Sequence, residues 1–207
     1  MNPRSVAEDS HGPCPSRSDS DLEDIRLVEA VRAGDERKFS ELYRKHVCWV
    51  YARLTRLLGP IAERDDLLQE SFLGLHRALP RFRGDARLTT FLHRIVVNVS
   101  YEHLTGACRR KWLPFSQSQL DELAEPSASP DMRAEQRQQV AQAFLLLDEL
   151  KPKKRIAFAL VAIEGMTLAE AAAVMGASED AVKQRVLQAR RELEQKSARK
   201  ARKDALP

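Results

Sequence analysis

Apolar residues recur at helical spacing through most of the chain, and this pattern is clearest in residues 164–193. The pattern there predicts two helices that meet at a short turn. Thr167 is placed to cap the first helix, with Glu170 three residues later in the capping-box position. Gly176 can adopt the positive φ that the turn requires, and Ser178 can cap the second helix. The segment therefore predicts a helix-turn-helix.

The second of these helices combines a buried stripe with a cationic, amide-bearing face. It opens with Glu179 and Asp180, which suit the positive end of a helix dipole. Its buried stripe is Val182, Val186, Ala189 and Leu193. The polar side chains on or beside the opposite face are Lys183, Gln184, Arg185, Gln188 and Arg191. Gln can pair with adenine edges, and Lys or Arg with guanine edges or phosphates. The pattern favours duplex DNA; the alternative is an ordinary helical hairpin with a solvated basic face.

The N-terminal half predicts four more helices, over residues 21–34, 35–59, 62–79 and 88–105. The first should turn one side toward a core, formed by Leu22, Ile25, Val28 and Ala30. The third should bury Leu68, Phe72, Leu75 and Leu79. Its opposite face carries Asp66, Glu70, Leu73 and Arg77. An exposed leucine among acids fits a solvated acidic surface and a protein-binding face equally well.

The helix predicted over residues 88–105 has an outer face that is unusual for a surface in water. Its buried side should hold Leu88, Leu92, Ile95 and Val99. Its outer face carries Thr90, Arg94, Val97 and Tyr101, with His93 and Asn98 at the edges. Arginine can hold phosphate, an aromatic ring can stack on a base, and an amide can bond a base edge, which favours single-stranded DNA. The alternative is that Val97 and Tyr101 pack on a neighbouring helix. We expect His93 to be a surface histidine.

Composition divides the chain into two domains. Residues 1–20 are rich in Ser, Pro and charge, and are expected to form a disordered tail. Residues 21–111 form the first domain and residues 112–130 a polar, proline-containing linker. Residues 131–196 form the second domain, which ends with the helix-turn-helix, and residues 197–207 are a basic tail. We predict an all-α fold of two small helical domains joined by a flexible linker.

Charge and cysteine content narrow the possible functions. The 207 residues carry a formal net charge of +4, and the basic residues gather in residues 76–111 and 183–203. Two basic zones indicate two contacts with a polyanion. Cys14, Cys48 and Cys108 are widely spaced and odd in number, so we expect a reducing cytoplasm and neither disulfides nor a metal or other cofactor. No apolar run reaches the length of a membrane span, so no membrane insertion is expected.

Two stretches resemble one family, the extracytoplasmic-function (ECF) sigma factors of bacterial RNA polymerase. Residues 65–98, DDLLQESFLGLHRALPRFRGDARLTTFLHRIVVN, are similar to the family's region 2. The run from Leu150 through EGMTLAEAAAVMGASEDAVKQRVLQARREL, which ends at Leu193, is similar to its region 4. The resemblance covers roughly residues 25–195. It implies a transcription factor that binds core polymerase, melts the minus-10 promoter element and reads the minus-35 element.

The resemblance also assigns roles to particular residues. Docking on the clamp helices of the polymerase's largest subunit is implied for Asp66, Gln69, Glu70 and Leu73. Capture of the non-template single strand at the minus-10 element is implied for Arg87, Thr90, Phe91, Arg94 and Asn98. The outer helix face adds Tyr101 to this set, and the basic end of the domain adds Arg109 and Arg110. Duplex reading at the minus-35 element is implied for Lys183, Gln184, Arg185, Gln188 and Arg191.

Three further expectations accompany these roles. The family usually has tryptophan at the position of Phe91, so a hydrogen bond that an indole donates in relatives cannot be made here. Many relatives are held inactive by an anti-sigma protein, which makes such a protein a further expected partner. A stand-alone helix-turn-helix regulator is the alternative function. An enzyme is not expected, because the sequence contains no catalytic or phosphate-binding motif.

Overall fold

The computed structural model of the protein describes residues 19–84, 86–107 and 130–204. All regular elements in these ranges are helical, which confirms the all-α prediction for the described part of the chain. They are α1 (Asp19–Arg32), α2 (Glu36–Leu58), α3 (Arg64–Ala78), η1 (Leu79–Arg81), α4 (Leu88–Ala107), α6 (Pro130–Asp148), α7 (Pro152–Phe158), η2 (Ala159–Ile163), α8 (Leu168–Met175) and α9 (Glu179–Asp204). η1 is a 3-10 helix, and η2 is a single π-helical turn that continues α7.

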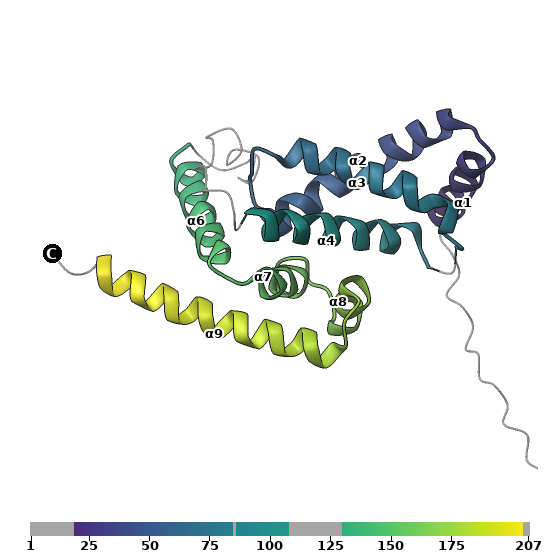
Figure 1. Cartoon of the computed structure of the whole chain (residues 1–207). Helices are drawn as coiled ribbons and strands as arrows, with labels where there is room; N and C mark the ends of the chain where they lie inside the picture. Colours follow the sequence, from purple (N-terminus) through teal and green to yellow (C-terminus); the bar gives the residue numbers. More distant parts are fainter. Residues whose placement is uncertain (1–18, 85, 108–129, 205–207) are drawn as a thin grey trace, which may run out of the picture.

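The helices form two layers (Figure 1). The N-terminal layer contains α1 to α4 and the C-terminal layer contains α7 to α9, while α6 stands upright at one end and contacts α9 as well as Gly59 at the end of α2. Within the N-terminal layer, α4 packs on α2 and α3, and its other side contacts α7 and α8 of the C-terminal layer. The two layers therefore share a boundary along α4.

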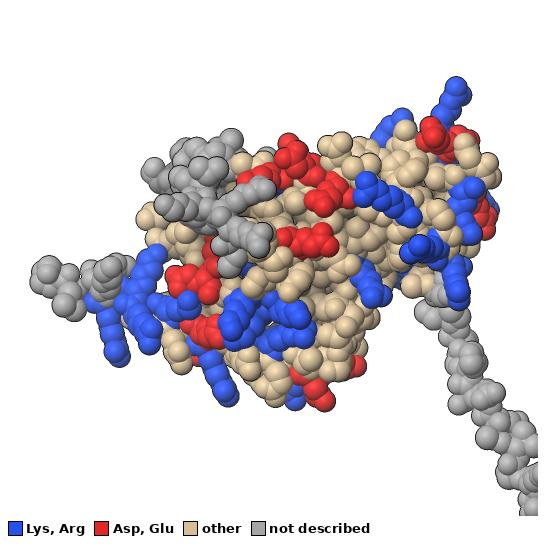
Figure 2. Space-filling model, viewed as in Figure 1, with Lys and Arg blue, Asp and Glu red and all other residues tan. Residues whose placement is uncertain are grey.

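The predicted tail and linker fall largely outside the described residues. Residues 19 and 20 of the predicted disordered tail belong to α1, and Pro130 of the predicted linker begins α6. At the other end, α9 continues to Asp204, so much of the predicted basic tail extends the second helix of the helix-turn-helix. Figure 2 shows Lys and Arg side chains gathered along this part of α9.

The core of the N-terminal layer follows the predicted helical stripes. α3 buries Leu68, Phe72 and Leu75, and Leu79 at the start of η1 is buried as well, as expected from their spacing. α2 begins after Asp35, whose carboxylate accepts a hydrogen bond from the Arg37 backbone N–H. α2 ends at Gly59, which has a φ of +82° that side-chain-bearing residues rarely adopt. Each of these boundaries is set by residues close in sequence.

The prediction for α1 was wrong at Leu22, which is 43% exposed. Asp24 is buried instead, because two side chains of α2 satisfy its carboxylate. His46 Nε2 lies 3.0 Å and Lys45 Nζ 2.8 Å from Asp24 Oδ1. Burial raises the pKa of Asp24, but the hydrogen bonds from His46 and Lys45 outweigh it, so the pKa is lowered overall. This ion cluster fixes α1 on α2.

The helix-turn-helix forms as its local sequence predicts. Thr167 and Glu170 make the complete capping box: the Glu170 N–H donates to Thr167 Oγ1, and the Thr167 N–H donates to Glu170 Oε2. Gly176 ends α8 in the left-handed conformation, with a φ of +58°. The Ala181 N–H donates to Ser178 Oγ at 3.3 Å, which caps α9. These contacts fix the angle at which α9 leaves the turn.

Candidate nucleic-acid interface

One exposed face of α4 carries three of the residues predicted to bind the minus-10 element. Thr90, Arg94 and Asn98 are spaced one helical turn apart, and all three are exposed. Arg87 lies just before the helix, and its Nε is 3.3 Å from Asp21 Oδ2. The face therefore presents a hydroxyl, a guanidinium and an amide in one row.

The aromatic residues of this region are less accessible than the polar ones. Phe91 is half-buried, with its ring centroid 5.1 Å from that of Phe82. Tyr101 is also half-buried, and the Lys153 ammonium lies 5.9 Å from its ring centroid. The prediction that Val97 is exposed was wrong, since it is 4% exposed. Its burial matches the alternative of packing against a neighbouring helix. Arg109 and Arg110 lie outside the described residues.

His93 was expected on the surface and is buried instead. Its ring makes an edge-on contact with Trp49, with centroids 5.4 Å apart. Burial, together with the charge of Arg53, lowers the pKa of His93 to about 4. The imidazole is therefore neutral at pH 7 and adds no charge to the α4 surface.

The outward face of α9 carries the residues predicted to read duplex DNA. Lys183, Gln184, Gln188 and Arg191 are exposed, and Arg185 is half-buried. Val182, Val186 and Ala189 are buried on the opposite side, as the stripe predicts. Two amides and several cations are thus presented along one side of a helix that the turn at Gly176 orients.

The acidic face of α3 is accessible along its length. Asp66, Gln69, Glu70 and Leu73 are all exposed, and Leu73 is 47% exposed. Leu67 and Leu68 on the other side of the helix are buried. The leucine therefore stands among acids on a surface that no other described element covers.

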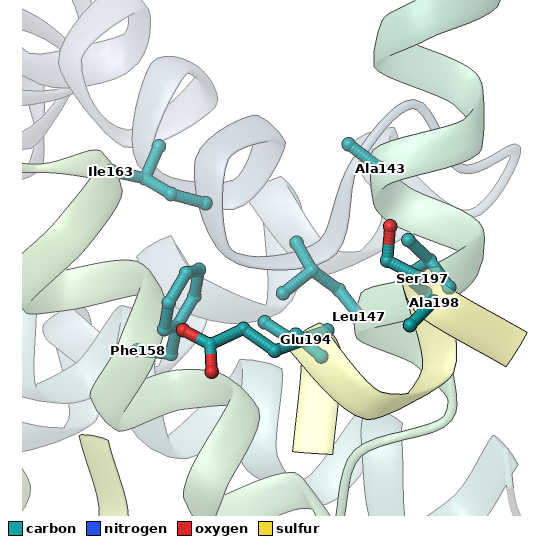
Figure 3. A pocket seen from close by; sticks show the side chains of 9 residues that line it. Ala143, Leu147, Phe158, Ile163, Glu194, Ser197 and Ala198 are labelled. Carbon is teal, nitrogen blue, oxygen red and sulfur yellow. The ribbon is translucent and has the colours of Figure 1, made fainter. Parts of the chain in front are cut away.

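An apolar hollow of about 690 Å³ opens between α6, α7 and α9 (Figure 3). Leu146, Leu147, Phe158, Ile163 and Leu193 form most of its wall, and Glu194 and Ser197 are its polar members. This lining pairs no nucleophile with a base.

Among the described residues, no group of three or more His, Cys, Asp or Glu could hold a metal ion. Within the same ranges, no helix is long and apolar enough to cross a membrane.

Sequence reasoning missed two charged residues between the layers, Arg155 and Glu164. Arg155 and the side chain of Glu164 are buried. They flank the apolar run of residues 156–163. A charged residue at each end of such an apolar run was the only sequence feature that could have indicated their burial. Nothing in the sequence identified their distant partners. Arg155 bonds to the Leu57 and Leu58 carbonyls of α2, 98 and 97 residues away. Glu164 lies beside Arg53 of α2 and His93 of α4.

These features define a helical DNA-binding protein of the helix-turn-helix class. Residues 42–110 match the family model of sigma-70 region 2, and residues 142–193 match that of sigma-70, region 4. The chain belongs to the ECF sigma factors of RNA polymerase. The resemblance recognised in the sequence is thereby confirmed.

Individual relatives agree with this assignment. The chain is 33% identical over 171 residues to the ECF RNA polymerase sigma factor SigM of Mycobacterium tuberculosis, covering 82% of each protein. It is 30% identical over 187 residues to the ECF RNA polymerase sigma-E factor of Salmonella typhimurium, covering 84% of this chain and 94% of that one. Its fold is similar to that of CnrH, solved in complex with the cytosolic domain of CnrY, with a TM-score of 0.55 and 28% identity over 83% of this chain and 95% of CnrH.

Proposed function

We propose that this sigma factor works through three separate surfaces. The acidic face of α3 docks on the clamp helices of core RNA polymerase, α4 holds the non-template strand of the minus-10 element, and α9 reads the minus-35 duplex. The proposal is carried by the two exposed polar rows, Thr90, Arg94 and Asn98 on α4 and the amides and cations of α9. A protein that bound only duplex DNA through α9 would not need the exposed polar residues on α4.

The α3 surface suits a protein partner better than DNA. Asp66 and Glu70 repel phosphate, while Leu73 offers an apolar group that can be buried in an interface. Polymerase is the partner that the family implies. We place the protein in the cytoplasm with polymerase and assign it no chemistry of its own, because its relatives are sigma factors and the lining of the apolar hollow suggests no reaction.

An anti-sigma protein is proposed as a further partner. The support is the likeness to CnrH, which was solved with the cytosolic domain of CnrY bound. A partner of that kind would keep the chain from polymerase until it is released.

The decisive experiment is transcription with purified components. Core polymerase plus this chain should initiate at a subset of genomic fragments that core alone does not transcribe. A chain that neither binds core nor supports any specific transcript would refute the proposal. If the chain is instead a stand-alone regulator, it should bind duplex DNA tightly without polymerase. An affinity measurement at controlled salt concentration detects this.

Gln184→Ala should change which minus-35 sequences are used. A glutamine that pairs with a base edge contributes roughly 1–3 kcal/mol of discrimination, so the preference at one base pair should fall by roughly 5- to 150-fold. Sequencing of transcripts from a randomised minus-35 library measures this. Gln195→Ala, an exposed change further along the same helix, is the matched control and should leave the preference unchanged. An unaltered preference in Gln184→Ala would remove Gln184 from the base readers.

A further inference from the structure

The far end of α9 carries a concentration of positive charge that none of the three proposed surfaces uses. Residues 195–204 contain five basic residues and one acid, which gives them a net charge of +4. The formal net charge of the whole chain is also +4, so the other residues together are neutral. α9 runs to Asp204, so this whole segment is helical. Figure 2 shows basic side chains projecting from this end of the molecule.

The exposed cations lie beyond the part of α9 that packs on the rest of the protein. α9 has 26 residues, or about 39 Å at a rise of about 1.5 Å per residue. Leu193 packs against the apolar cluster beneath the helix, and Ser197 and Ala198 border the hollow. Arg199 and Arg202 follow these contacts and are exposed. They therefore add nothing to the core of the helix-turn-helix.

Two ion pairs fix the direction of α9 just before these arginines. Lys154 Nζ of α7 lies 2.5 Å from Glu192 Oε1, and Lys196 Nζ lies 2.5 Å from Oε2 of Glu149, which follows α6. Lys196 is thus neutralised within the chain, whereas the arginines further along have no ion-pair partner among the described residues. Cations on a braced helix lose less conformational entropy on binding a polyanion than cations on a flexible tail.

The two arginines continue the side of α9 that is proposed to read DNA. An α-helix repeats every 3.6 residues, so positions 184, 188, 191, 195, 199 and 202 share one side. All six residues are exposed. Lys200, which is also exposed, is in register with the buried Val186 and so lies on the opposite side of the helix. The cationic end is therefore continuous with the proposed minus-35 surface along one side only.

The distance of these arginines from the base readers suits phosphates rather than base edges. Along the helix axis, Arg199 is about 22 Å and Arg202 about 27 Å from Gln184. The major groove is about 12 Å wide and winds around the duplex, so a straight helix cannot keep its whole length over base edges. In the proposed minus-35 complex, the far end of α9 passes over a wall of the groove, where phosphate oxygens are presented. A guanidinium can bind phosphate through two parallel hydrogen bonds.

We propose that Arg199 and Arg202 form a second phosphate-binding site, which holds the duplex backbone beside the minus-35 element whatever the sequence there. The inference rests on the proposed function for the position of α9 on a promoter, but the site itself requires only a DNA duplex. It divides α9 by role, because the first half selects the sequence while the far end contributes affinity and salt dependence.

Binding of the full chain to duplex DNA over a range of salt concentrations tests this site. The probe is a fluorescein-labelled duplex of about 30 base pairs and arbitrary sequence, since a phosphate contact needs no promoter. Arg199→Ala with Arg202→Ala removes two contacts, so the slope of log K against log[salt] should become shallower by about 1.8. Over the tenfold range below 1 M salt this slope corresponds to a loss of affinity of up to about 60-fold near 0.1 M. Fluorescence anisotropy measures both quantities.

Three control variants separate the site from a general effect of charge. Arg37→Ala with Arg44→Ala removes the same charge from exposed positions of α2 and should leave the slope unchanged. Lys200→Ala, on the other side of α9, should change the slope by less than the value of about 0.9 expected for Arg199→Ala alone. Arg199→Lys with Arg202→Lys keeps both charges and should retain the slope. Alanine favours helix, so the circular dichroism of the double alanine variant should match wild type.

Transcription with core polymerase from the randomised minus-35 library gives a second readout. The double alanine variant should lower the yield from all sequences by a similar factor and leave the preferred bases unchanged. A changed base preference, an unaltered salt slope or an equal effect of the α2 control would overturn the site. An unaltered slope would assign the cationic end of α9 to an acidic protein partner instead.

Failure of the proposed function has a different signature. In that case wild type gives no specific transcript with core polymerase, while the duplex measurement still reports whether Arg199 and Arg202 bind phosphate.

Discussion

Leu73→Glu is expected to weaken binding to core polymerase by roughly 100-fold and to lower sigma-dependent transcription accordingly. Leu73 is 47% exposed within the acidic face of α3, so the change leaves the fold intact. In the proposed complex this leucine becomes buried, and losing an apolar anchor costs about 1.5–3 kcal/mol. The new carboxylate adds the cost of an unpaired buried charge. Every 1.4 kcal/mol is a factor of about ten in the dissociation constant.

Fluorescence anisotropy with labelled protein and core polymerase measures this affinity. Leu22→Glu is the matched control, because Leu22 is a similarly exposed leucine, 43% accessible, on α1 of the same layer. Both variants should have the circular dichroism spectrum of wild type. Equal affinities of the two variants for core would show that α3 is not the docking surface.

Asn98→Ala and Arg94→Ala should weaken capture of the single-stranded minus-10 element in different ways. Both side chains are exposed on one face of α4. Loss of the amide removes a base contact, so binding should fall about tenfold to 100-fold on the preferred base and less on others. Loss of the guanidinium removes a phosphate contact, so binding should fall for every sequence, with a salt slope smaller by about 0.7.

Binding of holoenzyme to minus-10 oligonucleotides over a range of salt concentrations separates the two effects. Arg44→Ala removes an equal charge from an exposed site on α2 and serves as the control. Minus-35 duplex binding should not change in any of these variants. If Asn98→Ala lowered affinity equally for all bases, Asn98 would be a backbone contact rather than a base reader.

Features fixed by neighbouring residues were predictable from the sequence. The capping box of Thr167 and Glu170, the positive φ of Gly176 and the cap at Ser178 all arise within a few residues of each other. The exposed polar side of α9 could be predicted because Val182, Val186 and Ala189 form a buried stripe on the opposite side. These interactions are local, so periodicity and capping rules are sufficient to find them.

Features that depend on distant partners were not predictable. Asp24 is buried because His46 and Lys45 reach it from the next helix, which no periodic pattern reveals. Val97 and His93 were expected outside because one α-helix was considered alone. His93 packs against Trp49 of α2 and lies beside Glu164 of the C-terminal layer. α4 is also covered by α7 and α8, and Val97 is buried. A helix with two covered sides has no single polar face for periodicity to detect.

The acidic first turn of α9 has a consequence for how the duplex is approached. Glu179 and Asp180 stand at a helix N-terminus, an end that usually attracts phosphate. Their carboxylates cancel that attraction, so the tip of the helix is repelled by the DNA backbone while its cationic flank is drawn in. In the proposed minus-35 complex, this repulsion disfavours an end-on approach of α9 to the major groove. Repulsion of the end-on pose would shorten the time that the protein spends on nonspecific DNA before it reaches a promoter.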